Sequence, residues 1–175
     1  MNAICFSSAL GIALILTGCG KPSTAARVDP NGPVEVVIPD RGAYTGAFMD
    51  FGDAEDDVTL ETIEDFEEMV GKHQAIIVSS SYWGEQNFPA DNLNVIWRHG
   101  SLPLVFWSPW DKPYEEDHGP DKFSLNEILA GKWDAYIDKW ADDDRDVGQP
   151  MSVVVGVAMN GTVCTWYGVF TWGAK

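Results

Sequence analysis

The sequence predicts an α/β protein of the (β/α)8 TIM-barrel type, of which only about the first four β/α units are present. Four short apolar segments alternate with amphipathic helical segments, which is the pattern of βαβ units around a parallel sheet. The apolar run that begins at residue 75 is nearly continuous, as in a strand that is buried on both faces. A whole barrel typically needs about 250 residues, and this chain has 175.

The first predicted unit begins with a strand over residues 44–52, where large and small residues alternate. The acidic run 53–57 follows, and it is interpreted as a solvated loop because it lacks the spacing of a calcium-binding loop. Residues 59–70 are predicted to form an amphipathic helix, with apolar side chains on one face and glutamates on the other.

The next two strands are expected over residues 75–80 and 102–107, with a short helix over 88–99 between them. His73 precedes the earlier of these strands and is interpreted as structural or solvent-facing. The third strand ends in aromatic residues and a turn.

A capping box at Ser124 and Glu127 predicts the start of the last helix. Trp133 and Trp140 follow at a spacing that places both on one helical face, so they are interpreted as core residues. The fourth strand is predicted over residues 151–157.

The N-terminal region is predicted to direct export. Residues 1–18 carry no charged side chain and resemble a signal peptide, and the run ending in Thr17-Gly18-Cys19 resembles a bacterial lipobox. Cys19 is therefore expected to be lipidated; an ordinary signal peptide with a chance cysteine is the alternative. Residues 19–40 are expected to form a flexible tether and residues 41–175 the domain. An extracytoplasmic, membrane-anchored lipoprotein, on the cell surface or in the periplasm, is the predicted location.

Charge and cysteine content exclude several classes of function. The formal net charge of −16 disfavours nucleic acid as a partner and suits a neutral or cationic ligand. The three cysteines provide no disulfide framework and no zinc-binding spacing, and Cys164 is interpreted as a passive thiol. No metal or cofactor is expected.

Aromatic and amide side chains gather where the predicted strands end. Flat rings suit the C–H faces of sugars, and an asparagine amide both donates to and accepts from hydroxyl groups. Polysaccharide or oligosaccharide binding is the hypothesis; the alternative is that some of the rings only fill the mouth of the barrel. The candidate substrate-binding residues are Tyr82, Trp83, Trp107, Trp110, Asn160 and Trp166.

The segment 156–168 resembles the signature of glycoside hydrolase family 26, which has the pattern His-Glu-Met-Asn-Gly followed by an aromatic cluster. Met159-Asn160-Gly161 and Trp166 match it, whereas Val157 and Ala158 stand at the His and Glu positions. The resemblance implies a (β/α)8 barrel that acts on β-1,4-mannan or related β-glycans, as endo-β-1,4-mannanases do, by a retaining mechanism with two carboxylates on strands four and seven.

Ala158 occupies the family's acid/base position, and its methyl group can neither protonate a leaving group nor activate water. A seventh strand is not expected in a chain of this length. The resemblance therefore implies a truncated glycosidase that is catalytically impaired as written, and a non-catalytic carbohydrate-binding lipoprotein is the alternative. A half-barrel also leaves sheet edges and one sheet face uncovered. Self-association to complete the barrel, partial folding and an incomplete gene product stay open as explanations.

Overall fold

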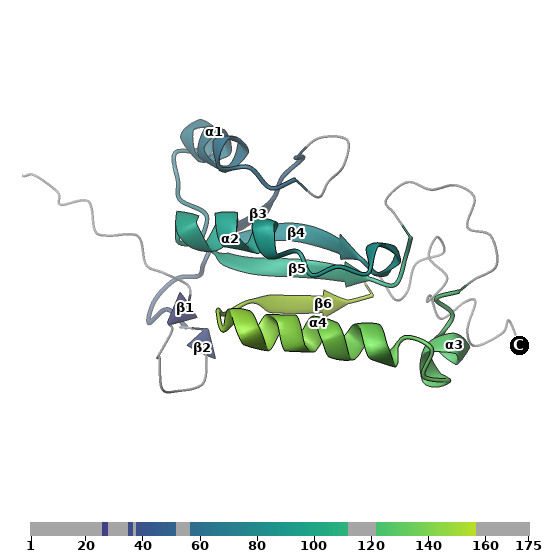
Figure 1. Cartoon of the computed structure of the whole chain (residues 1–175). Coiled ribbons are helices and arrows are strands. Elements are labelled where there is room, and N and C mark those ends of the chain that lie inside the picture. The colour runs from purple at the N-terminus through teal and green to yellow at the C-terminus, as the bar shows by residue number, and fades with distance from the viewer. Residues whose placement is uncertain (1–25, 28–34, 37, 52–56, 112–121, 157–175) are drawn as a thin grey trace, which may run out of the picture.

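The computed structural model describes residues 26–27, 35–36, 38–51, 57–111 and 122–156. Its centre is a parallel sheet of four strands in the order β3-β4-β5-β6, which is also their order along the chain (Figure 1). The strands are β3 (Gly46–Phe48), β4 (Ile76–Tyr82), β5 (Leu102–Ser108) and β6 (Ser152–Val155). The predicted α/β class with a parallel sheet is confirmed.

The lengths of the strands differ from the prediction at the edges of the sheet. β3 has three residues rather than the nine of 44–52, and it pairs only from Gly46 to Phe48 with β4. Gly46 is required there, because a Cβ would lie 2.8 Å from the carbonyl oxygen of Ile76. The central strands β4 and β5 pair over seven residues each, since each has a neighbour on both sides.

Local capping signals set the ends of the helices. Thr59 caps the first helix by accepting a hydrogen bond from the Thr62 N–H, and Ser124 accepts one from the Glu127 N–H as its capping box predicts. Gly71, Gly100 and Gly148 adopt left-handed backbone conformations where helices end. The helices are α1 (Leu60–Val70), α2 (Ala90–His99), α3 (Leu125–Leu129) and α4 (Asp134–Val147).

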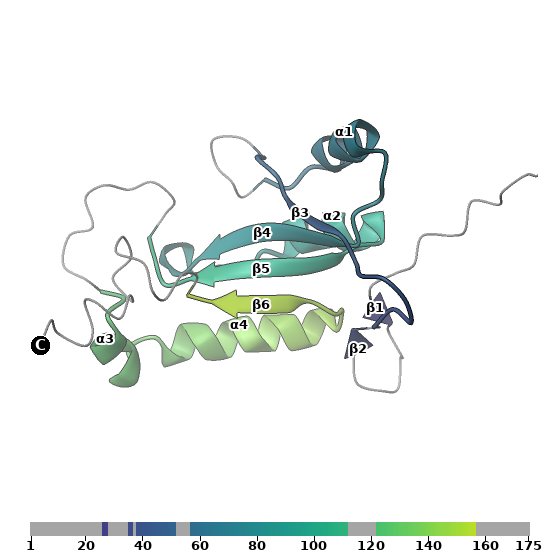
Figure 2. The ribbon, with the colours of Figure 1, turned by 180° about the vertical axis from the view of Figure 1, so that it is seen from behind.

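The longer helices pack on one face of the sheet (Figures 1 and 2). Ile63 of α1 and Ile96 of α2 are fully buried in one cluster with Ile77 of β4. A second, aromatic cluster joins Trp107 of β5 to Trp140 of α4. We call this the covered face.

No described helix covers the opposite face of the sheet (Figure 2). Phe48, Phe106 and Val154 share it by alternation and register. Phe48 is 54% exposed and Val154 36% exposed. We call this the open face, and the self-association expected from a partial barrel stays a prediction that concerns it.

Two short strands precede the sheet. β1 (Ala26–Arg27) and β2 (Glu35–Val36) form an antiparallel pair within the segment 19–40 that was expected to be a tether. Among the described residues, none of the helices has the length and apolar character needed to span a bilayer.

Candidate functional site at the carboxyl edge of the sheet

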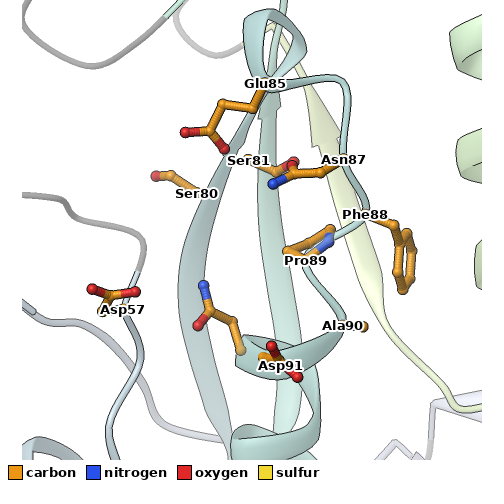
Figure 3. A pocket seen from close by; sticks show the side chains of 10 residues that line it. Asp57, Ser80, Ser81, Glu85, Asn87, Phe88, Pro89, Ala90 and Asp91 are labelled. Carbon is orange, nitrogen blue, oxygen red and sulfur yellow. The ribbon is translucent and has the colours of Figure 1, made fainter.

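A polar pocket of about 330 Å³ lies where β4 ends (Figure 3). Because all four strands are parallel, their carboxyl ends meet at one edge of the sheet, where α/β proteins commonly bind ligands. The lining of the pocket combines hydroxyl, amide and carboxylate groups. The lining residues are Asp57, Ser80, Ser81, Glu85, Asn87, Phe88, Pro89, Ala90, Asp91 and Asn92.

The end of β4 supplies one wall of this carboxyl-edge pocket. Ser80 and Ser81 are small, buried residues near the end of β4, which begins with three apolar residues. Directly after β4, a single 3₁₀ turn, η1 (Trp83–Glu85), places Glu85 at the top of the pocket in the view of Figure 3. The side chains of Glu85 and Asn87 lie beside those of Ser80 and Ser81 in this view.

The 3₁₀ turn is held by the loop that follows β5. The Gly84 N–H donates to the carbonyl oxygen of Trp110 at 2.8 Å. A Cβ on Gly84 would overlap the backbone of Asp111, so the close approach requires glycine. This contact fixes the position from which Glu85 faces the pocket.

The start of α2 and the segment before α1 form the other wall. Asn92 in the first turns of α2 accepts a hydrogen bond from the Val58 N–H at 3.1 Å. That bond holds Asp57 on the pocket's far side, while Asp91 lies at its base (Figure 3). Two segments that are far apart in sequence therefore build one site.

The charge of the lining selects the class of ligand. Asp57, Glu85 and Asp91 are acidic, and none of the described lining residues is basic. Anionic groups such as phosphates are disfavoured by this lining, whereas neutral polyhydroxylated molecules and cations are compatible with it. The pocket matches the preference expected from the net charge of −16.

A second, shallower hollow of about 580 Å³ adjoins the pocket. Asn87, Phe88 and Ala90 line both hollows. On its far side the hollow is lined by α4, where Lys139 is paired with Asp143 at 2.5 Å. Together the two hollows offer room for a ligand longer than one small ring.

The aromatic residues predicted to bind substrate lie at this edge but are largely buried. Tyr82, Trp83 and Trp107 are 7%, 3% and 8% exposed. The rings of Trp83 and Trp107 contact neighbouring rings: the centroid of Trp107 lies 5.1 Å from that of Trp83, and Trp107 stacks on Trp140 at 4.6 Å. Trp110 is partly exposed. The rings therefore pack as a core, and their part in ligand binding stays a prediction.

A buried hydrogen bond orders this aromatic core. The indole N–H of Trp107 donates to the phenolic oxygen of Tyr136 at 2.9 Å. Burial raises the pKa of Tyr136 above its usual value, and the bond from Trp107 partly offsets that rise. Tyr136 is therefore a neutral hydrogen-bonding group at any physiological pH.

The remaining predicted site residues lie outside the described part of the chain. These are Ala158 at the family's acid/base position, the candidate sugar-binding residues Asn160 and Trp166, and the lipidation site Cys19. The roles expected of them stay predictions.

The polar lining of the pocket was not predicted from the sequence. Glu85, Asn87 and Asp91 carry no recognisable motif. One feature of the sequence does point to the pocket. The apolar start of β4 is followed by Ser79-Ser80-Ser81 and then by Gly84-Glu85, so small polar residues stand at the carboxyl end of this strand.

Comparison with models of protein families finds no match for this chain, and comparison with curated proteins finds none either.

Proposed function

We propose that the protein binds a neutral oligosaccharide at the carboxyl-edge pocket and does not hydrolyse it. The observation that carries this proposal is the lining of the pocket, where serine hydroxyls, asparagine amides and carboxylates converge without a basic residue among the described lining. Sugar hydroxyls both donate and accept hydrogen bonds, and this set of side chains offers both roles.

The adjoining hollow supports an oligosaccharide rather than a single sugar. It shares three lining residues with the pocket and is lined on its far side by α4. In this proposal the further sugar units of a linear glycan lie in this second hollow.

The sequence resemblance supports the choice of β-glycans among oligosaccharides. In this proposal the sheet is the first part of a (β/α)8-type barrel related to glycoside hydrolase family 26, and mannan-type chains are the first ligands to test. Ala158 stands where the family has its acid/base, so binding is expected without turnover. Lipidation of Cys19 belongs to the same proposal, and the full chain is then expected in the membrane fraction of the cell.

Glycoside hydrolysis is the second candidate, and one observation favours it. Asp57, Glu85 and Asp91 bring three carboxyl groups to one pocket. A pair of carboxyl groups flanking the scissile bond is what glycosidases use, one as acid and one as base or nucleophile.

The test is thermal unfolding of the full chain with manno-, gluco- and xylo-oligosaccharides, combined with measurement of reducing ends released. A ligand that binds only the folded state raises the unfolding temperature. A free ligand concentration of about 100 times Kd adds about 2.7 kcal/mol to the free energy of unfolding. The expected result is a rise with one sugar series and no release of reducing ends.

Two variants locate the binding. Asn87→Ala is expected to remove most of the sugar-dependent rise because it deletes an amide shared by both hollows. Asp138→Asn alters an exposed carboxylate of α4 that lines neither hollow, so its response is expected to equal that of the native chain. Release of reducing ends establishes the hydrolytic candidate instead, and no rise with any sugar series overturns carbohydrate binding.

A further inference from the structure

A histidine–glutamate cluster lies at the amino end of the sheet, opposite the carboxyl-edge pocket. Glu67 belongs to α1, His73 lies just before β4, and His99 is the last residue of α2. Their side chains are 18%, 27% and 9% exposed. Each residue offers a nitrogen or oxygen atom, and these atoms all lie within 4.8 Å of one another.

The hydrogen bonds around His99 fix the state of its ring. The Ser101 hydroxyl donates to the carbonyl oxygen of Gln74 at 2.6 Å, and a hydroxyl has only one hydrogen to give. Nδ1 of His99, 2.8 Å from the same hydroxyl oxygen, must therefore be the donor in that contact. In the neutral ring this leaves Nε2 with an unprotonated lone pair.

That lone pair faces a carboxylate. Nε2 of His99 lies 3.3 Å from Oε2 of Glu67. Two electron-rich atoms at this separation repel each other unless a cation lies between them, and that cation is either a second proton on the ring or a metal ion.

His73 contacts the same carboxylate. Its Nδ1 lies 3.1 Å from Oε1 and 3.3 Å from Oε2 of Glu67. Its Nε2 is buried and has no hydrogen-bond partner among the described residues. The ring therefore interacts through the nitrogen that points at Glu67, and the two imidazoles lie against each other with centroids 4.8 Å apart.

The separations match a metal centre. Zinc binds histidine nitrogen and carboxylate oxygen at about 2.0–2.2 Å in a tetrahedron, whose edges are then about 3.3–3.5 Å. Nδ1 of His73 and Nε2 of His99 both lie 3.3 Å from the same atom, Oε2 of Glu67, which is close to these edges. These distances are also longer than the roughly 2.7–2.9 Å of a charge-assisted hydrogen bond.

The surroundings provide the support that metal ligands usually have. Ligating histidines commonly donate their second N–H to an oxygen, and ligating carboxylates are themselves hydrogen-bonded. His99 donates to Ser101, which is anchored on Gln74. Oε1 of Glu67 accepts the backbone N–H of Gln74 at 2.6 Å.

We propose that Glu67, His73 and His99 bind a zinc ion, with a water molecule in the fourth position. The ion joins α1, the segment before β4 and the end of α2, so it fastens two helices at the amino end of the sheet. The length of β4, about 20 Å at the usual rise per residue, separates it from the carboxyl-edge pocket, and the proposal is independent of sugar binding. The negative charge of the whole protein favours cation uptake.

The test is calorimetric titration of the metal-free full chain with a zinc salt, followed by thermal unfolding with and without zinc. One ion per chain and a higher unfolding temperature are expected. Ser101→Ala leaves all three ligands in place but removes the support of His99, so its zinc affinity is expected to fall about 10- to 100-fold. Glu67→Gln and His99→Gln, which each remove a ligand, are expected to lower the affinity further.

His118→Gln is the matched control, because it removes the chain's remaining histidine and is expected to leave the stoichiometry and affinity unchanged. If His99→Gln does not unfold cooperatively, the zinc titrations of Ser101→Ala and Glu67→Gln test the proposal in its place. The proposal is overturned if the native chain takes up no zinc. It is equally overturned if Glu67→Gln and Ser101→Ala bind zinc as tightly as the native chain.

Discussion

The covered and open faces of the sheet both carry aromatic side chains, but these side chains differ in their exposure to solvent. On the covered face, Trp107 and Trp140 are less than a tenth exposed and stack at 4.6 Å. On the open face, Phe48 and Phe106 also stack, at 6.1 Å, yet Phe48 remains 54% exposed. Aromatic content alone therefore does not make a core; a second layer that removes the rings from water does.

The difference follows from the connections of the chain. Each crossover between neighbouring parallel strands places its helix on the same side, so that α1, α2 and α4 accumulate on the covered face. Among the described residues no element is left for the open face. In a closed barrel that face is covered by the side chains of further strands.

The largest expected effect comes from deleting a ring on the covered face. Trp140 contacts Trp107 and also Phe88, whose ring centroid is 5.0 Å away. Trp140→Ala leaves a cavity between α4 and the sheet and is expected to lower the free energy of unfolding by about 3–5 kcal/mol. Chemical denaturation of the full chain measures it.

Phe48→Ala on the open face is the matched control. About half of that side chain is already in water, so a loss of about 1 kcal/mol or less is expected. Equal losses from the two substitutions contradict the distinction between the faces and indicate that something buries Phe48 in solution.

Removal of the buried phenolic oxygen of Tyr136 is expected to have a smaller effect on the free energy of unfolding. Tyr136→Phe removes the acceptor of the Trp107 indole N–H and leaves that donor buried without its partner. A loss of about 1–3 kcal/mol in the free energy of unfolding is expected at neutral pH.

The same substitution has a pH signature. Burial raises the pKa of Tyr136 in the folded state, so above about pH 10 the unfolded chain loses this proton before the folded chain does. Stability is therefore constant below that pH and falls as the pH rises through the folded-state value. The alkaline fall is expected to be shallower in Tyr136→Phe, and denaturation curves measured from pH 8 to 11 check it. Parallel falls in both proteins contradict a raised pKa.

The fold was predictable where its cause is local, and the sites were not. Short apolar runs located β4 and β5, and the capping box at Ser124 located the start of α3, because these signals act over a few residues. The spacing of Trp133 and Trp140 correctly placed both against the core. The extent of β3 depended on pairing with β4, a partner distant in sequence, and was overestimated.

Tertiary assembly explains why the site residues were missed. Glu67, His73 and His99 meet only because α1 and α2 end at the same edge of the sheet, so no spacing along the chain reveals them. The carboxyl-edge pocket likewise needs Asp57 to lie opposite Glu85. The buried positions of Trp83 and Trp107 depend on the docking of α4, whereas the sequence shows only that both stand at strand ends.

The smallest expected effect sharpens the comparison within the covered face, and it has the opposite sign. Ser79 alternates with Ile77 along β4 and so faces the helices, and its fully buried hydroxyl makes no hydrogen bond among the described residues. A buried hydroxyl without a partner costs about 1–3 kcal/mol, so Ser79→Ala is expected to raise the free energy of unfolding by about 1 kcal/mol. Ser101→Ala, measured in a metal chelator, is the matched control, because its buried hydroxyl is bonded to Gln74 and its loss is expected to destabilise. Destabilisation by both substitutions contradicts an unpaired Ser79 and implies that its hydroxyl has found a partner, such as a buried water, inside the covered face.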